Sequence, residues 1–160
     1  MKIVMLDRNS IGFDIDVEFF AKLGDFEYHN TADAATSKSL IKDADVVIFN
    51  KTKMNEEMLN EAINVKLLCV TATGFDNIDL DYAKARGIAA CNIKDYSTPA
   101  VVQHTFALAL SVLEKIRYYD DYVKSGKYSE QMGFSHFEKT YFELQGKTWG
   151  IIGLGNIGRG

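Results

Sequence analysis

Short apolar runs, four to six residues long, recur along the chain between more polar segments. They are rich in β-branched residues, which is typical of strands buried on both faces of a parallel sheet. The pattern predicts strands at 3–6, 46–49, 67–70, 88–93 and 149–152, with 26–29 as a weaker candidate.

The segments between these runs carry apolar residues three or four positions apart, which is the period of an amphipathic helix. The alternation of strand and helix predicts an α/β fold with a doubly wound parallel sheet. Right-handed crossover connections are expected to place the helices on both faces of this sheet. The predicted helices are 16–23, 37–44, 55–62 and 80–86.

A longer and more apolar helix is predicted from Thr98, with the only proline of the chain, Pro99, in its first turn. Thr98 can accept a hydrogen bond from a free backbone amide, and proline at this position loses no helical hydrogen bond. The apolar pattern runs on to about Val123. Such a helix is suited to connect two domains or to pack against another subunit.

The segment 125–144 is polar and irregular but contains many large apolar side chains. This combination predicts an arm that packs on another surface rather than a free linker. The side chains are Tyr128, Met132, Phe134, Phe137, Tyr141 and Phe142.

Composition narrows the class of protein. Of the 160 residues, 47% are hydrophobic and 25% are charged, as in ordinary globular proteins. The net charge is −4 and no segment concentrates Lys and Arg, which argues against a nucleic-acid partner. The first apolar run is too short for a signal peptide or a membrane span, so we expect a cytoplasmic protein. Cys69 and Cys91 lie in predicted strands as buried thiols, and neither a disulfide nor a metal site is indicated.

A glycine-rich motif, Gly153-Leu154-Gly155-Asn156-Ile157-Gly158, directly follows the last predicted strand. A strand followed by glycines at this spacing is the dinucleotide-binding fingerprint, and an ordinary glycine-rich turn is the alternative. Gly153 permits the tight turn, Gly155 admits the pyrophosphate, and Gly158 allows close packing of the next helix on the strand. The phosphates would meet the amides of Asn156 and Ile157. The next helix and the acidic residue expected about 20 positions further on are absent, so this chain alone is expected to bind a dinucleotide poorly.

Ligands of an open α/β sheet bind beyond the carboxyl ends of its strands, which are here followed by the loops 7–10, 50–52 and 71–77. The backbone amides of Thr73 and Gly74 could hold a small carboxylate. Lys51 could add a positive charge beside it, although a solvated surface lysine is an equally good interpretation. Asp76 and Asn77 are interpreted as turn and capping residues ahead of the helix 80–86.

Three motifs occur in the order found in one enzyme family. Together they resemble the D-isomer-specific 2-hydroxyacid dehydrogenases along the whole chain. The motifs are Thr73-Gly74-Phe75-Asp76-Asn77-Ile78-Asp79, then Tyr96-Ser97-Thr98 leading to Val102-Gln103-His104-Thr105, then Gly153 to Gly158.

The resemblance implies a flavodoxin-like substrate domain at 1–97, then a long crossover helix and the first strand of an NAD-binding Rossmann domain at 98–160. It implies that the amides of Thr73 and Gly74 hold the substrate carboxylate, and that Gly153, Gly155, Asn156, Ile157 and Gly158 contact the cofactor. The catalytic arginine, glutamate and histidine of the family lie downstream, so no catalytic residue is assigned in this chain. The chain is therefore expected to be the front part of a longer enzyme and inactive alone.

The family resemblance also implies a homodimer, formed through the helix from Thr98 and the segment 125–144, called here the aromatic arm. The segments 50–52 and 96–98 with Gln103-His104 are most similar to glycerate dehydrogenase or hydroxypyruvate reductase, which favours glycerate and hydroxypyruvate as substrates, with lactate and pyruvate next. Gln103 stands where many relatives have Glu. A non-catalytic dimerising or partner-binding domain of the same fold is the alternative.

Overall fold

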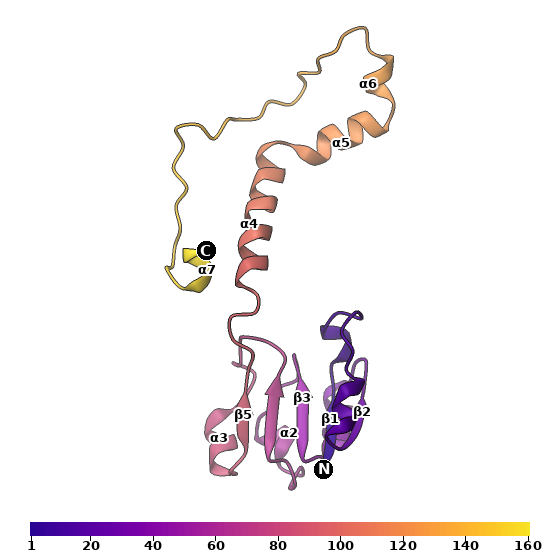
Figure 1. The fold of residues 1–160 in the computed structure, drawn as a ribbon, viewed down its shortest axis with the longest axis vertical. Coiled ribbons are helices and arrows are strands. Elements are labelled where there is room, and N and C mark those ends of the chain that lie inside the picture. The colour runs from indigo at the N-terminus through magenta and orange to yellow at the C-terminus, as the bar shows by residue number, and fades with distance from the viewer. The chain divides into compact units, whose positions relative to one another are not determined.

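The computed structural model describes residues 1–160, which form two compact units, Met1–Lys94 and Asp95–Gly160 (Figure 1). The first unit contains all the strands, and the second contains helices joined by irregular segments. The break between them lies three residues before the boundary expected at 97/98.

The first unit is built on a five-stranded, all-parallel sheet with the strand order β2-β1-β3-β4-β5. This confirms the predicted α/β parallel sheet, and the weaker candidate at 26–29 is its edge strand β2. Figure 1 shows β2 at one edge of the sheet and β5 at the other. The strands are β1 (Lys2–Met5), β2 (Asp25–Tyr28), β3 (Val46–Phe49), β4 (Leu67–Val70) and β5 (Ala89–Cys91).

The two faces of the sheet are covered unequally. The strand order reverses at β1, and right-handed crossovers therefore send the β1-to-β2 connection to one face and the three later connections to the other. The main core, with Val4, Phe49 and Leu68 fully buried, lies on the face of the three α-helices. These helices are α1 (Ala34–Leu40), α2 (Glu56–Leu59) and α3 (Leu80–Ala85), each capped by the side chain of the preceding Asp33, Asn55 or Asp79.

The opposite face carries only 3₁₀ turns, η1 (Arg8–Ser10) and η2 (Glu18–Lys22), so the α-helix predicted at 16–23 is wrong in type. Strand β2 begins only a few residues after η2, and its pairing starts at Asp25, whose amide donates to the carbonyl of Met1 at 2.9 Å. The segment therefore has little room for a longer helix. A small core cluster around Ile3, Met5 and Ile48 lies on this face. Towards β5 the face is more open: Cys69 is half-buried and Cys91 is exposed, so the expectation of two buried thiols is wrong for Cys91.

The predicted long helix is two helices, α4 (Thr98–Leu113) and α5 (Ile116–Lys124). Lys115 between them has a φ of 55°, in the left-handed region, which breaks the continuous helix that was expected to reach Val123. Pro99 lies in the first turn as predicted, but no side chain caps the helix, so the capping role of Thr98 is wrong. No helix of the structure combines the length and the apolar character needed to cross a lipid bilayer.

The segment after α5 contains one helical turn, α6 (Lys127–Glu130), and is otherwise irregular. Its large apolar side chains are exposed in the single chain, Phe134 to 90% and Phe137 to 85%. The strand predicted at 149–152 is not formed, because a strand requires a paired neighbour and the second unit contains no other strand. The glycine-rich motif ends in a single helical turn, α7 (Asn156–Arg159).

Candidate functional site

The carboxyl ends of β1 and β3 are joined by the side chain of Asp7. Its Oδ2 atom accepts hydrogen bonds from the amide of Asn50 at 2.8 Å, the amide of Lys51 at 3.1 Å and the hydroxyl of Thr52 at 3.3 Å. A carboxylate that accepts several N–H and O–H bonds is a strong local restraint. Asp7 therefore fixes the backbone of the loop that carries Lys51.

Asn77 holds the same loop from the other side. Its Nδ2 atom donates to the carbonyl of Asn50 at 2.9 Å and to that of Thr52 at 3.0 Å. Asp76 and Asn77 lie in the predicted turn, which is closed by the amide of Ile78 donating to the carbonyl of Phe75 at 3.0 Å. Their expected capping role is wrong, because Asp79 caps α3 by accepting from the amide of Tyr82. The loops after β1, β3 and β4 thus meet in one hydrogen-bonded group.

The loop after β4 presents free backbone amides. Thr73 and Gly74 are exposed, and their N–H groups donate to no other group of the chain. The polar atoms around them are occupied: the hydroxyl of Thr73 donates to the carbonyl of Ile93 at 3.0 Å, and Nδ2 of Asn92 donates to the carbonyl of Thr73 at 2.8 Å. The loop is therefore held in place, and its amides remain available to a ligand.

Lys51 lies beside a cavity of the first unit that does not include the loop of Thr73 and Gly74. Its amide is bonded to Asp7, and its ammonium group pairs with no acidic side chain. It lines a cavity of about 670 Å³ together with Asp7, Lys38, Thr52 and Lys53. Thr73 and Gly74 do not line this cavity, so the two parts of the predicted substrate site are linked through Asn50 and Asn77 rather than through a shared hollow.

The glycine-rich motif forms a tight turn followed by the start of a helix. Gly153 has a φ of 98°, a conformation that side chains rarely adopt, and the helical turn begins at Asn156. The amides of Asn156 and Ile157 donate to no other group of the chain, and no side chain caps them. The motif thus ends in a helical turn of only four residues, and the full helix that completes the dinucleotide-binding fingerprint is not formed.

Each glycine of the motif has a distinct environment. A Cβ atom at Gly158 would collide with the carbonyl oxygen of Gly153 and would lie 3.4 Å from the side chain of Ile151. Gly158 therefore packs closely on the turn and on the segment before it, as predicted, although that segment is not a strand. Gly155 faces open space. The side chain of Asn156 donates to Asp95 and accepts from Arg159, which ties the turn to the segment that precedes α4.

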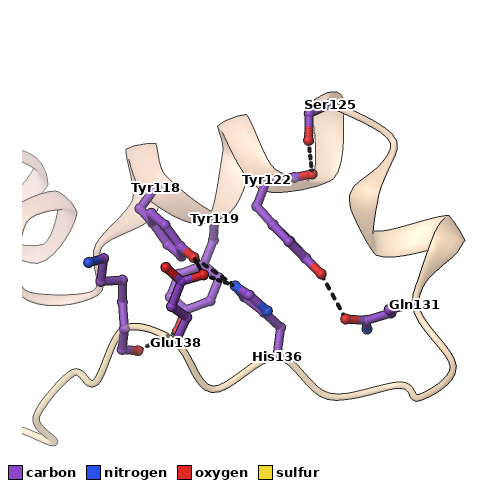
Figure 2. Close-up of polar contacts among 8 residues, drawn as sticks. Tyr118, Tyr119, Tyr122, Ser125, Gln131, His136 and Glu138 are labelled. Carbon is purple, nitrogen blue, oxygen red and sulfur yellow. Dashed lines mark hydrogen bonds and ion pairs between the residues drawn. The ribbon is translucent and has the colours of Figure 1, made fainter.

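A second polar group, absent from the sequence predictions, joins α5 to the aromatic arm (Figure 2). The ring of His136 stacks on the ring of Tyr122 with 3.7 Å between centroids, and its Nε2 atom lies 2.7 Å from the hydroxyl of Tyr118. That hydroxyl donates to Glu138 at 2.8 Å, and desolvation together with this bond raises the pKa of Tyr118 to about 12. These contacts fasten the arm to α5.

Comparison with known proteins gives consistent matches. Residues 3–148 match the family model described as D-isomer specific 2-hydroxyacid dehydrogenase, catalytic domain. The chain is 34% identical to the hydroxypyruvate reductase of Blautia hydrogenotrophica, over 99% of this chain and 51% of that protein. It is 31% identical to the glycerate dehydrogenase of Methylorubrum extorquens, over 99% of this chain and 50% of that protein.

Solved structures share the fold. The D-lactate dehydrogenase of Aquifex aeolicus, solved with NAD and lactic acid, superposes with a TM-score of 0.78 at 29% identity and covers 99% of this chain and 46% of its own. The chain thus spans about half the length of the relatives that it matches. With the family model matched over almost its whole length, the chain belongs to the D-isomer-specific 2-hydroxyacid dehydrogenase family.

Proposed function

We propose that the chain forms the substrate domain (1–97) and the beginning of the coenzyme domain (98–160) of a cytoplasmic NAD-dependent dehydrogenase. The reaction of the intact enzyme is the transfer of a hydride between NAD(H) and a small D-2-hydroxy acid or 2-oxo acid. Glycerate and hydroxypyruvate are the favoured substrates, with lactate and pyruvate next. Two relatives that cover the chain from end to end carry the names hydroxypyruvate reductase and glycerate dehydrogenase, which supports this preference.

The observation that carries the proposal is the pair of free amides at Thr73 and Gly74. A carboxylate can accept both N–H groups, and the bonds of Asn92 and Ile93 to Thr73 keep the pair in place before a ligand arrives. An acid held by its carboxylate keeps its hydroxyl or carbonyl carbon free for reaction. The role of this domain is therefore binding and orientation.

The glycine-rich turn is suited to a dinucleotide. The free amides of Asn156 and Ile157 can donate to phosphate oxygens, and open space at Gly155 allows close approach. Gly153 and Gly158 make the turn itself. Bound to these residues, NAD would supply the hydride chemistry.

No residue of this chain is assigned to proton transfer. Lys51 is proposed as a positive charge for the acidic substrate, because it lies on the loop bonded to Asn77 and has no acidic partner. We further propose a homodimer formed through α4 and the aromatic arm. Exposed Phe134 and Phe137 favour such a contact, and they also fit the alternative of a non-catalytic partner-binding domain.

The test is NADH oxidation by the full-length protein with hydroxypyruvate, glyoxylate and pyruvate, and with hydroxyacetone as a ketone that lacks the carboxylate. We expect turnover with 2-oxo acids and none with hydroxyacetone. Lys51→Gln should raise KM by up to about fivefold, since an exposed ion pair is worth up to about 1 kcal/mol, whereas the control Lys22→Gln should leave KM unchanged. Absence of turnover with all three acids would contradict the proposal, and a dimer without activity would favour the alternative.

A further inference from the structure

The two cysteines of the chain are neighbours in space. Cys69 on β4 and Cys91 on β5 are register partners in the parallel sheet, and Sγ of Cys91 donates to Sγ of Cys69 at 3.5 Å. The connection between the strands closes a loop with a sequence separation of 22 residues. The sequence alone indicates no disulfide, because the spacing of the two cysteines does not reveal that they lie on neighbouring strands.

The backbone geometry is compatible with a bond between the two sulfur atoms. Neighbouring strands lie about 4.8 Å apart, which is within the separation of Cα atoms that disulfides span. The sulfur atoms must approach by roughly 1.5 Å to reach the bond length. β5 is an edge strand of three residues with a single neighbour, so a small shift of this strand disturbs few other contacts.

The two thiols differ in their access to reagents. Cys91 is exposed and lines an open cavity of about 250 Å³ with Phe75, Asn92 and Lys94. Cys69 is half-buried, and burial raises the pKa of its thiol to about 12. An external reagent therefore meets Cys91 first, and Cys69 is placed to react with whatever forms there.

We propose that Cys69 and Cys91 are a dithiol modification site that low-molecular-weight disulfides, such as oxidised glutathione, convert into an intrachain disulfide. The thiolate of Cys91 attacks one sulfur of the reagent, the reagent's S–S bond breaks, and one glutathione thiolate leaves. Cys69 then loses its proton to solvent and attacks the Cys91 sulfur, which expels the second glutathione thiolate. Two protein thiols are oxidised, and one disulfide reagent is reduced to two thiols.

The cross-link would join the strands that lead into the loop of free amides. The loop after β4 contains Thr73, and Asn92, directly after Cys91, donates to the carbonyl of Thr73. The disulfide would therefore hold the ends of β4 and β5 together at this loop. The proposal concerns the thiols alone and does not depend on the proposed dehydrogenase function.

The test is treatment of the purified full chain with oxidised glutathione at pH 8 under native conditions, followed by intact mass and peptide mapping. We expect a loss of two hydrogen masses, no lasting glutathione adduct, and a Cys69–Cys91 linked peptide. The oxidised chain should melt roughly 5 °C higher or more, and dithiothreitol should reverse the shift.

Two matched variants separate the steps. Cys69→Ser should stop at a glutathione adduct on Cys91, and Cys91→Ser should react at least about tenfold more slowly than the unchanged chain, because only the half-buried thiol remains. Far-UV circular dichroism checks that both are folded. A stable glutathione adduct on the unchanged chain, disulfide-linked dimers, or no reaction would each overturn the proposal. Because these outcomes are measured on the unchanged chain, they decide the proposal even if a variant fails to fold.

Discussion

Replacement of Asp7 by alanine would remove the acceptor that holds the loop after β3. The Oδ2 atom accepts from the amides of Asn50 and Lys51 and from the hydroxyl of Thr52, at 2.8, 3.1 and 3.3 Å. Alanine cannot replace any of these bonds. The half-buried amide of Asn50 would lose its partner, while the exposed amide of Lys51 can bond to water.

The magnitude follows from this difference in exposure. A hydrogen bond to a charged group contributes about 1.5–3 kcal/mol. The bond from the exposed amide of Lys51 contributes much less, and the bond from the half-buried hydroxyl of Thr52 is weak because it is long, at 3.3 Å. We therefore expect Asp7→Ala to lower the free energy of unfolding by about 2 kcal/mol. The loop should also open more often, so the amides of Asn50 and Lys51 should exchange with solvent faster.

Urea unfolding followed by circular dichroism gives the first quantity, and amide hydrogen exchange gives the second. Asp43→Ala is the matched control, because Asp43 is an exposed acid without a hydrogen bond or ion pair. If Asp7→Ala and Asp43→Ala unfold at the same urea concentration and Asn50 exchanges equally slowly in both, Asp7 does not hold the loop.

Three further predictions concern other parts of the chain. Leu68→Ala leaves a cavity at a fully buried position in the main core and should lower the free energy of unfolding, measured with urea, by about 3 kcal/mol. A decrease of less than about 1 kcal/mol would contradict this. The amide of Lys2 donates to Asp45 and holds the pKa of this carboxyl below its usual 3.8, so its contribution to stability is present above pH 3.8 and lost as the pH falls through the lower folded pKa. The stability difference between the unchanged chain and Asp45→Asn should shrink in acid, and a constant difference would refute this. Tyr118, with its pKa raised to about 12, should stay protonated at pH 10.5 in an absorbance titration, whereas Tyr118 ionising with the ordinary tyrosines would contradict the bond to Glu138.

The strands of the first unit could be predicted because their signal is local. β1, β3 and β4 coincide with apolar runs that are buried by the helices above them. The turn at Gly153 was likewise readable from the spacing of its glycines. The break at Lys115 was not, because no glycine or proline marks it.

The supports of the candidate site depend on contacts between distant residues. Asp7 bonds to a loop more than 40 positions away, Asn77 to residues 25 and 27 positions away, and Asn92 to Thr73 across 19 positions. A single sequence carries no signal for such pairs, so the sequence predicted for Asn77 its place in a turn but not its bonds to the loop after β3. The strand expected at 149–152 failed for a similar reason, since pairing requires a neighbour that the local pattern does not reveal.

The central claim is that the amides of Thr73 and Gly74 bind a carboxylate. A titration of the ¹⁵N-labelled chain with hydroxypyruvate, followed by two-dimensional NMR, observes these two groups directly. We predict that the amide resonances of Thr73 and Gly74 shift most and saturate together, and that hydroxyacetone leaves them in place. Unchanged resonances at both residues, or equal shifts with hydroxyacetone, would contradict the claim.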